Sequence, residues 1–211
     1  MTDAATIAGG FAEVDAGTWL ACRGQPAAFL GDAVRRRRKG FFLRDRASLD
    51  LVTTTGHAWC ADASRPFLTH IPCAAPVSAV SSKVLVAPEA ARSGSELVKV
   101  IPMSAKGSLV ATRFEKEWVV MATASRATRI VVKDGDTLSV RPGAVVAWTG
   151  PRPTGYVRRL GMLDILLPRS PRELVLHFHG PCVVWSEGAA PQLSPFKFSS
   201  FNSASRRAYG V

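Results

Sequence analysis

The chain has 211 residues, of which 47% are hydrophobic and 20% are charged. A chain of this length and composition buries a sizeable core, which excludes a predominantly disordered protein. Its formal net charge of +11 favours anionic partners such as RNA or acidic lipid headgroups. The same charge is equally compatible with a basic protein that has no anionic partner.

The sequence indicates neither secretion nor insertion into a membrane. The first 17 residues contain three acidic residues and no Lys or Arg, unlike a signal or transit peptide. No apolar run approaches the roughly 18 residues that cross a bilayer, so we expect no membrane span. Four cysteines in a chain this long do not make a disulfide framework, so we expect a reducing compartment.

Short strands dominate the chain from its start to its end. The segments are rich in Val, Leu, Phe, Trp and Thr, and Gly, Pro, Asp or Ser separates most of them. The predicted strands are 18–23, 40–45, 48–54, 97–101, 108–114, 117–124, 128–133, 137–140, 144–148, 173–178 and 182–187. We expect one short helix, near residues 88–96, because Pro88 suits a first helical position. The pattern predicts an all-β protein, an antiparallel β-sandwich or jelly-roll-like fold built from repeated hairpin units.

The segment "VVKDGDTLSVRPGAVVAWTG", residues 131–150, contains two predicted hairpin turns. Asp134 and Gly135 suit a two-residue turn with positive φ. Pro142 and Gly143 suit the central positions of a type II turn, in which Gly143 takes a positive φ. Between the turns, alternation places Leu138 and Val140 on one face of a strand.

We expect a single domain over residues 1–194, of which residues 1–16 are a candidate flexible start. The composition shifts after residue 194 to Ser, Phe and Arg. Three phenylalanines are many for a free tail, so residues 195–211 are interpreted as a tail or a docking arm.

Two segments resemble the altered-inheritance-of-mitochondria family of β proteins, which are linked to mitochondrial biogenesis. They are "GDTLSVRPGAVVAWTG", residues 135–150, and "ELVLHFHGPCVVWSEG", residues 173–188. The family has a Gly-Pro-Gly turn and a later Gln-Ser; here the turn is Gly180-Pro181-Cys182 and the strand ends in Trp-Ser-Glu. The resemblance implies a β-sandwich of repeated units, similar to the tryptophan RNA-binding attenuation protein, that tends to assemble. It implies no catalytic residues, and a location in mitochondria or in bacterial cytoplasm.

Three pairs share the spacing His-x-x-Cys, which is a spacing that lets both side chains reach one metal ion. Two of them, His57 with Cys60 and His70 with Cys73, form a candidate His₂Cys₂ zinc site. The alternative is that the cysteines are buried apolar residues and that no metal is bound. Other catalytic templates are missing, because the chain has neither a Gly-x-Ser-x-Gly elbow nor a Gly-Lys-Ser phosphate loop. We therefore expect a protein that is not an enzyme and needs no cofactor.

The basic segment is the one concentration of positive charge. It comprises Arg35, Arg36, Arg37, Arg38 and Lys39, with Arg44 and Arg46 after it. We expect a loop leading into a strand near Phe41, because five adjacent cations are not buried together. Such a loop is either only solvated or an RNA-contacting finger, since guanidinium groups pair well with phosphate.

Three functions follow from these observations. The first is a non-enzymatic scaffold or interaction protein of the mitochondrial-biogenesis type, with protein partners or self-assembly. The alternatives are an RNA-contacting subunit of a ribonucleoprotein such as a mitochondrial ribosome, and a zinc-binding β module.

Overall fold

The computed structural model describes residues 5–21, 26–36, 49–98, 109–159 and 172–188. Within these ranges the chain forms β-strands and three short 3₁₀ turns, without an α-helix. Every strand pair is antiparallel. The predicted all-β antiparallel sandwich is confirmed, and none of the described elements is a helix that could cross a membrane.

Two of the four sheets lie toward the N-terminal end of the fold. The first sheet has the strand order β1-β2-β7-β4, and the second has the order β5-β6-β3-β10-β13-β8. Their strands are β1 (Thr6–Ala8), β2 (Phe11–Val14), β3 (Gly17–Ala21), β4 (Pro26–Phe29), β5 (Ala33–Arg36), β6 (Asp50–Thr54), β7 (Ala58–Cys60), β8 (Phe67–Pro72), β10 (Val84–Pro88) and β13 (Trp118–Thr123).

The C-terminal half contains two further sheets. The third sheet has the order β11-β12-β9-β16-β19-β14, and the fourth has the order β15-β18-β17. Their strands are β9 (Val77–Val80), β11 (Arg92–Val98), β12 (Leu109–Phe114), β14 (Ala127–Val132), β15 (Thr137–Val140), β16 (Val145–Thr149), β17 (Thr154–Arg159), β18 (Arg172–His179) and β19 (Cys182–Glu187). The 3₁₀ turns are η1 (Ser81–Lys83), η2 (Glu89–Ala91) and η4 (Pro142–Ala144).

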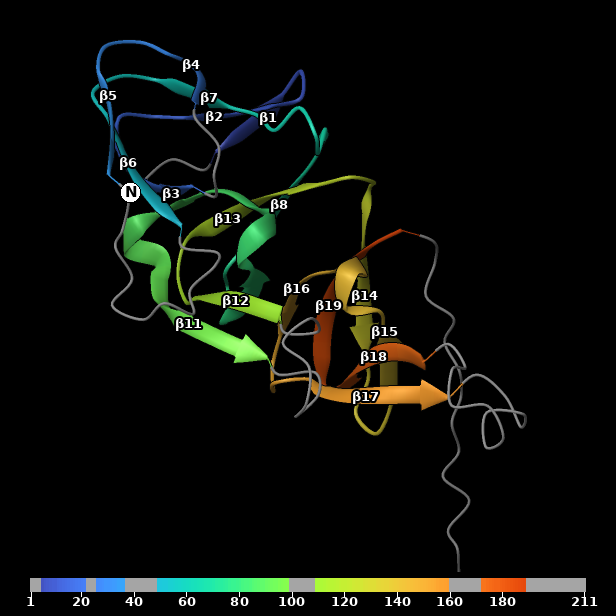
Figure 1. The fold of residues 1–211 in the computed structure, drawn as a ribbon. Helices are drawn as coiled ribbons and strands as arrows, with labels where there is room; N and C mark the ends of the chain where they lie inside the picture. Colours follow the sequence, from blue (N-terminus) through green and yellow to red (C-terminus); the bar gives the residue numbers. More distant parts are fainter. Residues whose placement is uncertain (1–4, 22–25, 37–48, 99–108, 160–171, 189–211) are drawn as a thin grey trace, which may run out of the picture.

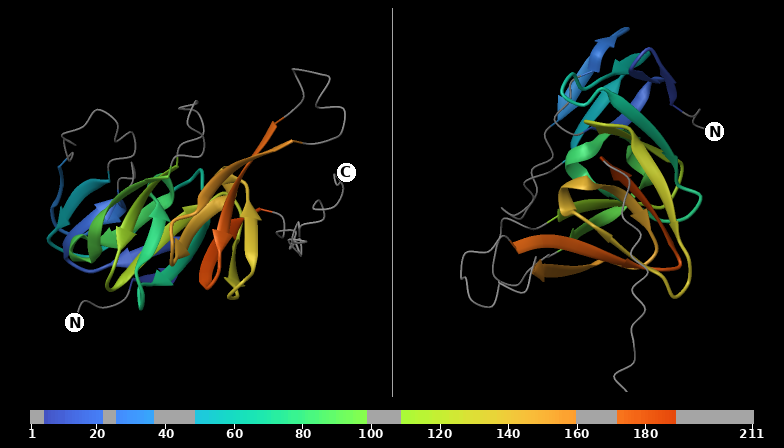
Figure 2. Two further views of the ribbon diagram at one scale, coloured as in Figure 1. Left: turned by 90° about the horizontal axis from the view of Figure 1, so that it is seen from below. Right: turned by 90° about the vertical axis from the view of Figure 1, so that its right-hand side faces the viewer.

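The four sheets stack as successive layers, with one apolar core in each of the three spaces between them (Figures 1 and 2). One core joins the first sheet to the second and contains Trp19 and Trp118. The central core lies between the two six-stranded sheets, and the last joins the third sheet to the fourth. The protein is therefore a stack of sandwiches in which the two middle sheets are covered on both faces.

This layering explains why some strands are apolar at every position. In β13, Trp118 and Val120 face the core beneath the first sheet, whereas Val119 and Met121 face the central core. All six β13 residues are buried. Side chains alternate between the two faces of a strand, so a strand with a core on each side needs an apolar residue at each position.

The strand order repeats through the stack. The first sheet contains β4-β7-β2, the second contains β10-β13-β8, and the third contains β16-β19-β14. Likewise, β5-β6-β3, β11-β12-β9 and β17-β18-β15 recur in the second, third and fourth sheets. Each step adds six to every strand number. The two six-stranded sheets therefore each combine two half-sheets, which are joined by the pairs β3–β10 and β9–β16.

An irregularity in the backbone confirms that the repeated strands are equivalent. The pairing register shifts at the same place in three strands: between Pro26 and Ala28 in β4, Val84 and Val86 in β10, and Val145 and Ala147 in β16. The shift recurs 58 and then 61 residues later along the chain. Bulges of this kind are kept as features of a fold, so their recurrence marks three structural repeats.

The two turns predicted in residues 131–150 connect different layers and are not hairpins. Gly135 has φ +78° as predicted, and Asp136 N–H donates to the Lys133 carbonyl, but β14 and β15 belong to different sheets. Pro142 and Gly143 form the 3₁₀ turn η4 between β15 and β16, and Gly143 has no positive φ. The type II prediction is wrong because the chain crosses between layers here instead of reversing within one.

Other predicted elements also differ from the structure. The helix predicted at 88–96 is only the single turn η2, after which β11 begins at Arg92. Packing within a β stack overrides the weak helix signal of such a short segment. Within the predicted flexible start, residues 6–8 and 11–14 are β1 and β2 of the first sheet. The predicted tail, residues 195–211, lies outside the described residues.

Candidate functional site

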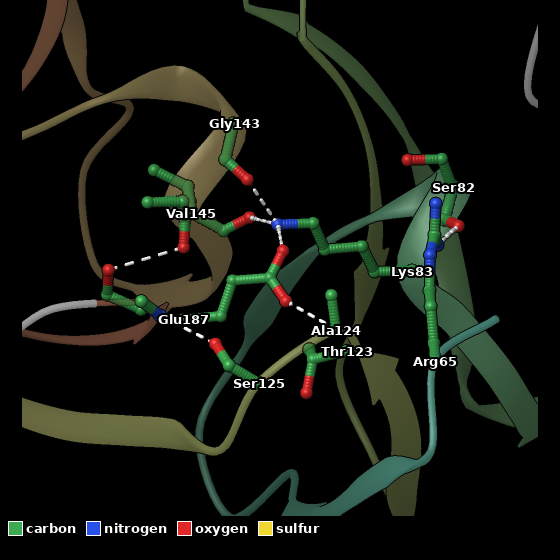
Figure 3. Close-up of polar contacts among 12 residues, drawn as sticks. Arg65, Ser82, Lys83, Thr123, Ala124, Ser125, Gly143, Val145 and Glu187 are labelled. Carbon is green, nitrogen blue, oxygen red and sulfur yellow. Dashed lines mark hydrogen bonds and ion pairs between the residues drawn. The ribbon is translucent and has the colours of Figure 1, made fainter.

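Lys83 is a buried cation at the junction of the second and third sheets (Figure 3). It ends η1, which links β9 of the third sheet to β10 of the second. Its Nζ donates to the Gly143 carbonyl at 2.6 Å and to the Val145 carbonyl at 2.8 Å, and lies 2.5 Å from Glu187 Oε1. An ammonium has three donors, so each of them has an acceptor here.

Glu187 extends this cluster to the end of β13. Its Oε2 accepts a hydrogen bond from Ala124 N–H at 2.8 Å, and the neighbouring Gly188 N–H donates to Ser125 Oγ at 2.9 Å. On the other side of Lys83, the Arg65 guanidinium donates to the Ser82 carbonyl. The cluster therefore ties η1, η4, β19 and the β13–β14 link together.

The geometry of the cluster indicates a structural clasp. Burial lowers the pKa of Lys83, and Arg65 adds to this, whereas the hydrogen bond and the charge of Glu187 oppose it. A nucleophilic or basic lysine needs a free lone pair, but this ammonium is held by three acceptors. The pair was not predicted from the sequence, since a Lys and a Glu beside strand ends are typical of exposed positions.

The basic segment begins in a strand. Arg35 and Arg36 belong to β5, where they lie opposite Val52 and Leu51 of β6. The prediction of a loop is wrong for these two residues, because β6 supplies them with a partner strand. The remaining predicted contacts, Arg37, Arg38, Lys39, Arg44 and Arg46, lie outside the described residues. β5 is an edge strand of the second sheet, so the described part of the segment borders one side of the stack.

The four candidate zinc ligands are not brought together. Cys60 is buried between the first and second sheets, whereas Cys73 is buried in the central core on the other face of the second sheet. His57 Nδ1 lies 2.9 Å from Asp15 Oδ1, and the His70 ring packs 5.9 Å from that of Trp118. No group of three or more metal-binding side chains occurs in the described parts of the chain. Burial also raises the pKa of both thiols to about 11, which disfavours the thiolate that binds metal.

His177 and His179 lie on one face of β18. Their ring centroids are 6.4 Å apart, and Phe178 between them is buried in the core beneath. His179 Nδ1 shares a hydrogen bond of 3.0 Å with Thr137 Oγ1 of β15. Gly180 and Pro181, predicted as a turn, join β18 to β19 through a cis peptide bond. Like the other predicted turns, this one crosses from the fourth sheet to the third.

Exposed apolar side chains are concentrated in the first strands of the chain. Seven large apolar residues of the described ranges are exposed, and five of them fall within residues 7–34. We call these five the N-terminal apolar set: Ile7, Phe11, Phe29, Leu30 and Val34. The other two are Phe67 in β8 and Val131 in β14. This set was not predicted, since an apolar residue in a strand is ordinarily assigned to a core. Only comparison of the repeats distinguishes an exposed apolar residue from a buried one.

The clearest example in this set is Phe29. The register shifts make Phe29 of β4 equivalent to Ala87 of β10 and Trp148 of β16. Those two side chains are 0% and 1% exposed, whereas Phe29 is 48% exposed. An exposed apolar residue at a position that is buried in the other repeats is the pattern expected of an interaction surface.

Comparison with known proteins supports the fold and adds no activity. No family model and no curated protein matches the chain. The structure is similar to the crystal structure of a protein from Streptococcus pyogenes, with a TM-score of 0.62 and 12% sequence identity. The match covers 85% of this chain and 88% of that one. The name of the streptococcal protein states no activity or partner, and at this identity the similarity shows a shared fold alone.

Proposed function

We propose that the protein is a non-enzymatic interaction protein that acts as a scaffold within a larger assembly. The observation that carries this proposal is the N-terminal apolar set, which leaves large apolar side chains in water at one end of a well-packed stack. Solvent-exposed apolar groups are unfavourable in isolation, and a partner that covers them gains about 25 cal/mol for each Å² removed from water.

The resemblance to the altered-inheritance-of-mitochondria family supports the same proposal. That family is associated with organelle organisation and carries no catalytic residues, and its members are similar to proteins that assemble. Membership in this family, and a mitochondrial or bacterial cytoplasmic location, are part of the proposal.

Two matched double variants test the proposed docking end. Phe29→Ser with Leu30→Ser removes apolar residues that are 48% and 57% exposed, and Phe67→Ser with Val131→Ser removes residues that are 46% and 57% exposed. Each variant is tagged, expressed in the source cells and purified with its bound proteins for quantitative mass spectrometry. We expect the first variant to lose partners that the wild type and the second variant retain. Identical partner lists for both variants would reject the docking end.

RNA contact is a second candidate function, favoured by the net charge of +11 and by the edge position of Arg35 and Arg36. Guanidinium groups on an edge strand can reach phosphates without displacing a neighbouring strand. Replacing Arg35, Arg36, Arg37 and Arg38 by Ser is expected to weaken RNA binding and to flatten its salt dependence by up to about four phosphate contacts. Filter binding with equal affinity and equal salt slope for both proteins would exclude this function.

A further inference from the structure

The two terminal sheets are complementary halves of the sheets between them. Each middle sheet joins a half-sheet of the type β4-β7-β2 to one of the type β5-β6-β3. The first sheet has only the former type, extended by β1, and the fourth sheet has only the latter type, β17-β18-β15. The stack therefore begins with one unmatched half and ends with the other.

The edges that would join these halves are β4 and β15. In the middle sheets, the equivalents of β4 are β10 and β16, and they pair with β3 and β9. Within the described residues β4 pairs only with β7, and β15 pairs only with β18. Backbone N–H and C=O groups along such an edge favour pairing with another strand.

The pairing register in the two middle sheets is the same. Ala87 of β10 lies opposite Leu20 of β3, and the equivalent Trp148 of β16 lies opposite Ser78 of β9. The next positions, Pro88 and Thr149, lie opposite Trp19 and Val77. The register is therefore a property of the repeat and predicts the partner of every residue at the unmatched edges.

We infer that β4 of one copy pairs antiparallel with β15 of a second copy, which completes a six-stranded sheet between them. In the repeated register, Phe29 lies opposite Ser139 of the second copy, and Leu30 lies opposite Leu138. This inference rests on the proposed interaction function and names the partner of the docking end. Because the two edges differ, the contact is head-to-tail, and its repetition generates a ring or a filament.

The burial of the edge residues fits this pairing. Phe29 is 48% exposed where its equivalents in β10 and β16 are buried, and Ser139 is exposed where its equivalent, Ser78 of β9, is buried. Phe29 lacks the neighbouring strand that covers Ala87 and Trp148, whereas Ser139 lacks both that strand and the further layer that covers Ser78.

Two features of the ends define the contact further. The outer face of the fourth sheet exposes Ser139, Thr154 and His179 and is polar, as in a terminal repeat. We therefore expect copies to meet edge to edge and not face to face. Proline blunts strand edges because it lacks an N–H, and Pro26 begins β4. Its equivalents, Val84 and Val145, do not take part in the β3–β10 and β9–β16 ladders, so Pro26 does not block this register.

Cross-linking between two proteins with introduced cysteines tests the pairing. One carries Phe29→Cys and the other Ser139→Cys. With Cys22→Ser in both, the remaining native thiols are those of Cys60, Cys73 and Cys182, which are buried. Residues opposite each other in antiparallel strands have Cα atoms about 4.5–5.5 Å apart, a distance that a disulfide spans. Mixing the two with oxidised glutathione is expected to give a mixed disulfide dimer, and each protein alone is expected to give little dimer.

A third protein, with Thr154→Cys, is the matched control. Thr154 lies in the same row of the fourth sheet as Ser139, because both are opposite His177. It is also exposed, but it belongs to β17, whose equivalents β5 and β11 are edges in the middle sheets. Mixed with the Phe29→Cys protein, it is expected to cross-link at least tenfold less than the Ser139→Cys protein.

The possible outcomes separate this inference from the proposed function. If the Phe29→Cys protein cross-links with neither the Ser139→Cys nor the Thr154→Cys protein, or equally with both, the β4–β15 pairing is overturned. In that case the interaction function still stands if Phe29→Ser with Leu30→Ser loses its co-purifying proteins. Selective cross-linking supports the pairing even if that double variant keeps its other partners. Sedimentation equilibrium gives a second readout. The pairing is further supported if the mass of the wild type rises with concentration and that of Phe29→Ser with Leu30→Ser does not. A wild-type mass that stays monomeric up to 1 mM, on the order of the weakest specific complexes, counts against the pairing.

Discussion

A single lysine shows how a charge is accommodated inside a β stack. Lys83 is 7% exposed, and its ammonium is satisfied by two carbonyl oxygens and the Glu187 carboxylate. Removing one partner of a buried ion pair is far more costly than never having had the pair, because the other charge stays buried and uncompensated. The side chain therefore specifies how the layers connect more than it adds to stability.

The first prediction concerns this lysine. Lys83→Met is expected to lower the free energy of unfolding by about 3–5 kcal/mol, because it leaves the Glu187 carboxylate, only 15% exposed, without its ion-pair partner and leaves two carbonyls unpaired. Adding Glu187→Gln removes the charge and keeps an acceptor for Ala124 N–H, so the double variant is expected to recover part of the loss. Urea denaturation measures both. A Lys83→Met protein within about 0.5 kcal/mol of wild type would contradict the clasp.

The second prediction concerns the buried thiols of Cys60 and Cys73. Burial raises the pKa of each from 9.0 to about 11. Between these values the unfolded chain has lost the protons that the folded chain retains, so stability falls as pH rises. The expected loss between pH 8 and pH 10 is about 1.3 kcal/mol for each thiol.

Replacing both cysteines by Ala isolates this contribution. The double variant is less stable at pH 8, because it loses buried volume, but its stability is expected to fall less steeply toward pH 10. Urea melts at the two pH values give the difference. If the double variant and the wild type lose equal stability, the thiols do not titrate in this window.

At the scale of the element, the strands were more predictable than their connections. Alternation placed Leu138 and Val140 on the buried face of β15, and both are in the core. The turn residues were also found at turns, since Gly135 takes the positive φ expected of it. Local chemistry identifies where a chain turns, but the sheet in which the next strand pairs depends on contacts 36 to 72 residues away. For this reason the turns at 134–135 and 142–143 were assigned to hairpins although they cross between layers.

The third prediction concerns two glycines in such crossings. A Cβ at Gly180 would collide with the Lys133 carbonyl and would lie 2.9 Å from the Val132 oxygen, whereas a Cβ at Gly143 meets open space. Gly180→Ala is therefore expected to destabilise the protein by about 1–3 kcal/mol. Gly143→Ala, the matched control, is expected to change stability by less than about 0.5 kcal/mol. Thermal and urea melts compare them, and equal effects would show that the Gly180 crossing adjusts freely.

In the molecule as a whole, the repeat explains the layering of the sheets and the exposure of Phe29, which no single segment of the sequence reveals. The all-β class followed from the many short apolar segments, but the layering required knowledge of which strands pair. The exposed position of Phe29 became informative only beside Ala87 and Trp148, which have different side chains. Repeated units were predicted, but because the repeats share backbone register more than residue identity, neither their boundaries nor the N-terminal apolar set could be read from the sequence.

The fourth prediction compares two equivalent phenylalanines in different layers. Phe114 lies opposite Val77 in the central core, and Phe178 lies opposite Leu138 beneath the fourth sheet. Both are fully buried, so each change to Ala is expected to cost about 3–5 kcal/mol of local packing energy.

The two variants are expected to differ in which strands they release. In a stack of repeats, a terminal layer has one neighbour and a central layer has two. Phe178→Ala is therefore expected to speed hydrogen exchange in β15, β17 and β18 first, and Phe114→Ala to speed it in the second and third sheets together. Mass spectrometry of exchanged peptides resolves these regions. The same exchange pattern in both variants would mean that the four layers unfold as one unit.

The sharing of each middle sheet between two repeats has a consequence for synthesis on the ribosome. The second sheet includes β3, which ends at Ala21, and β13, which ends at Thr123. The third sheet likewise cannot be complete until β19, which ends at Glu187, has been synthesised. Translation delivers about 5–20 residues per second, so the early strands spend several seconds with open edges before their neighbours emerge. The nascent chain is then exposed to pairing with other nascent chains, and a chaperone that shields strand edges would act on this protein before its synthesis is complete.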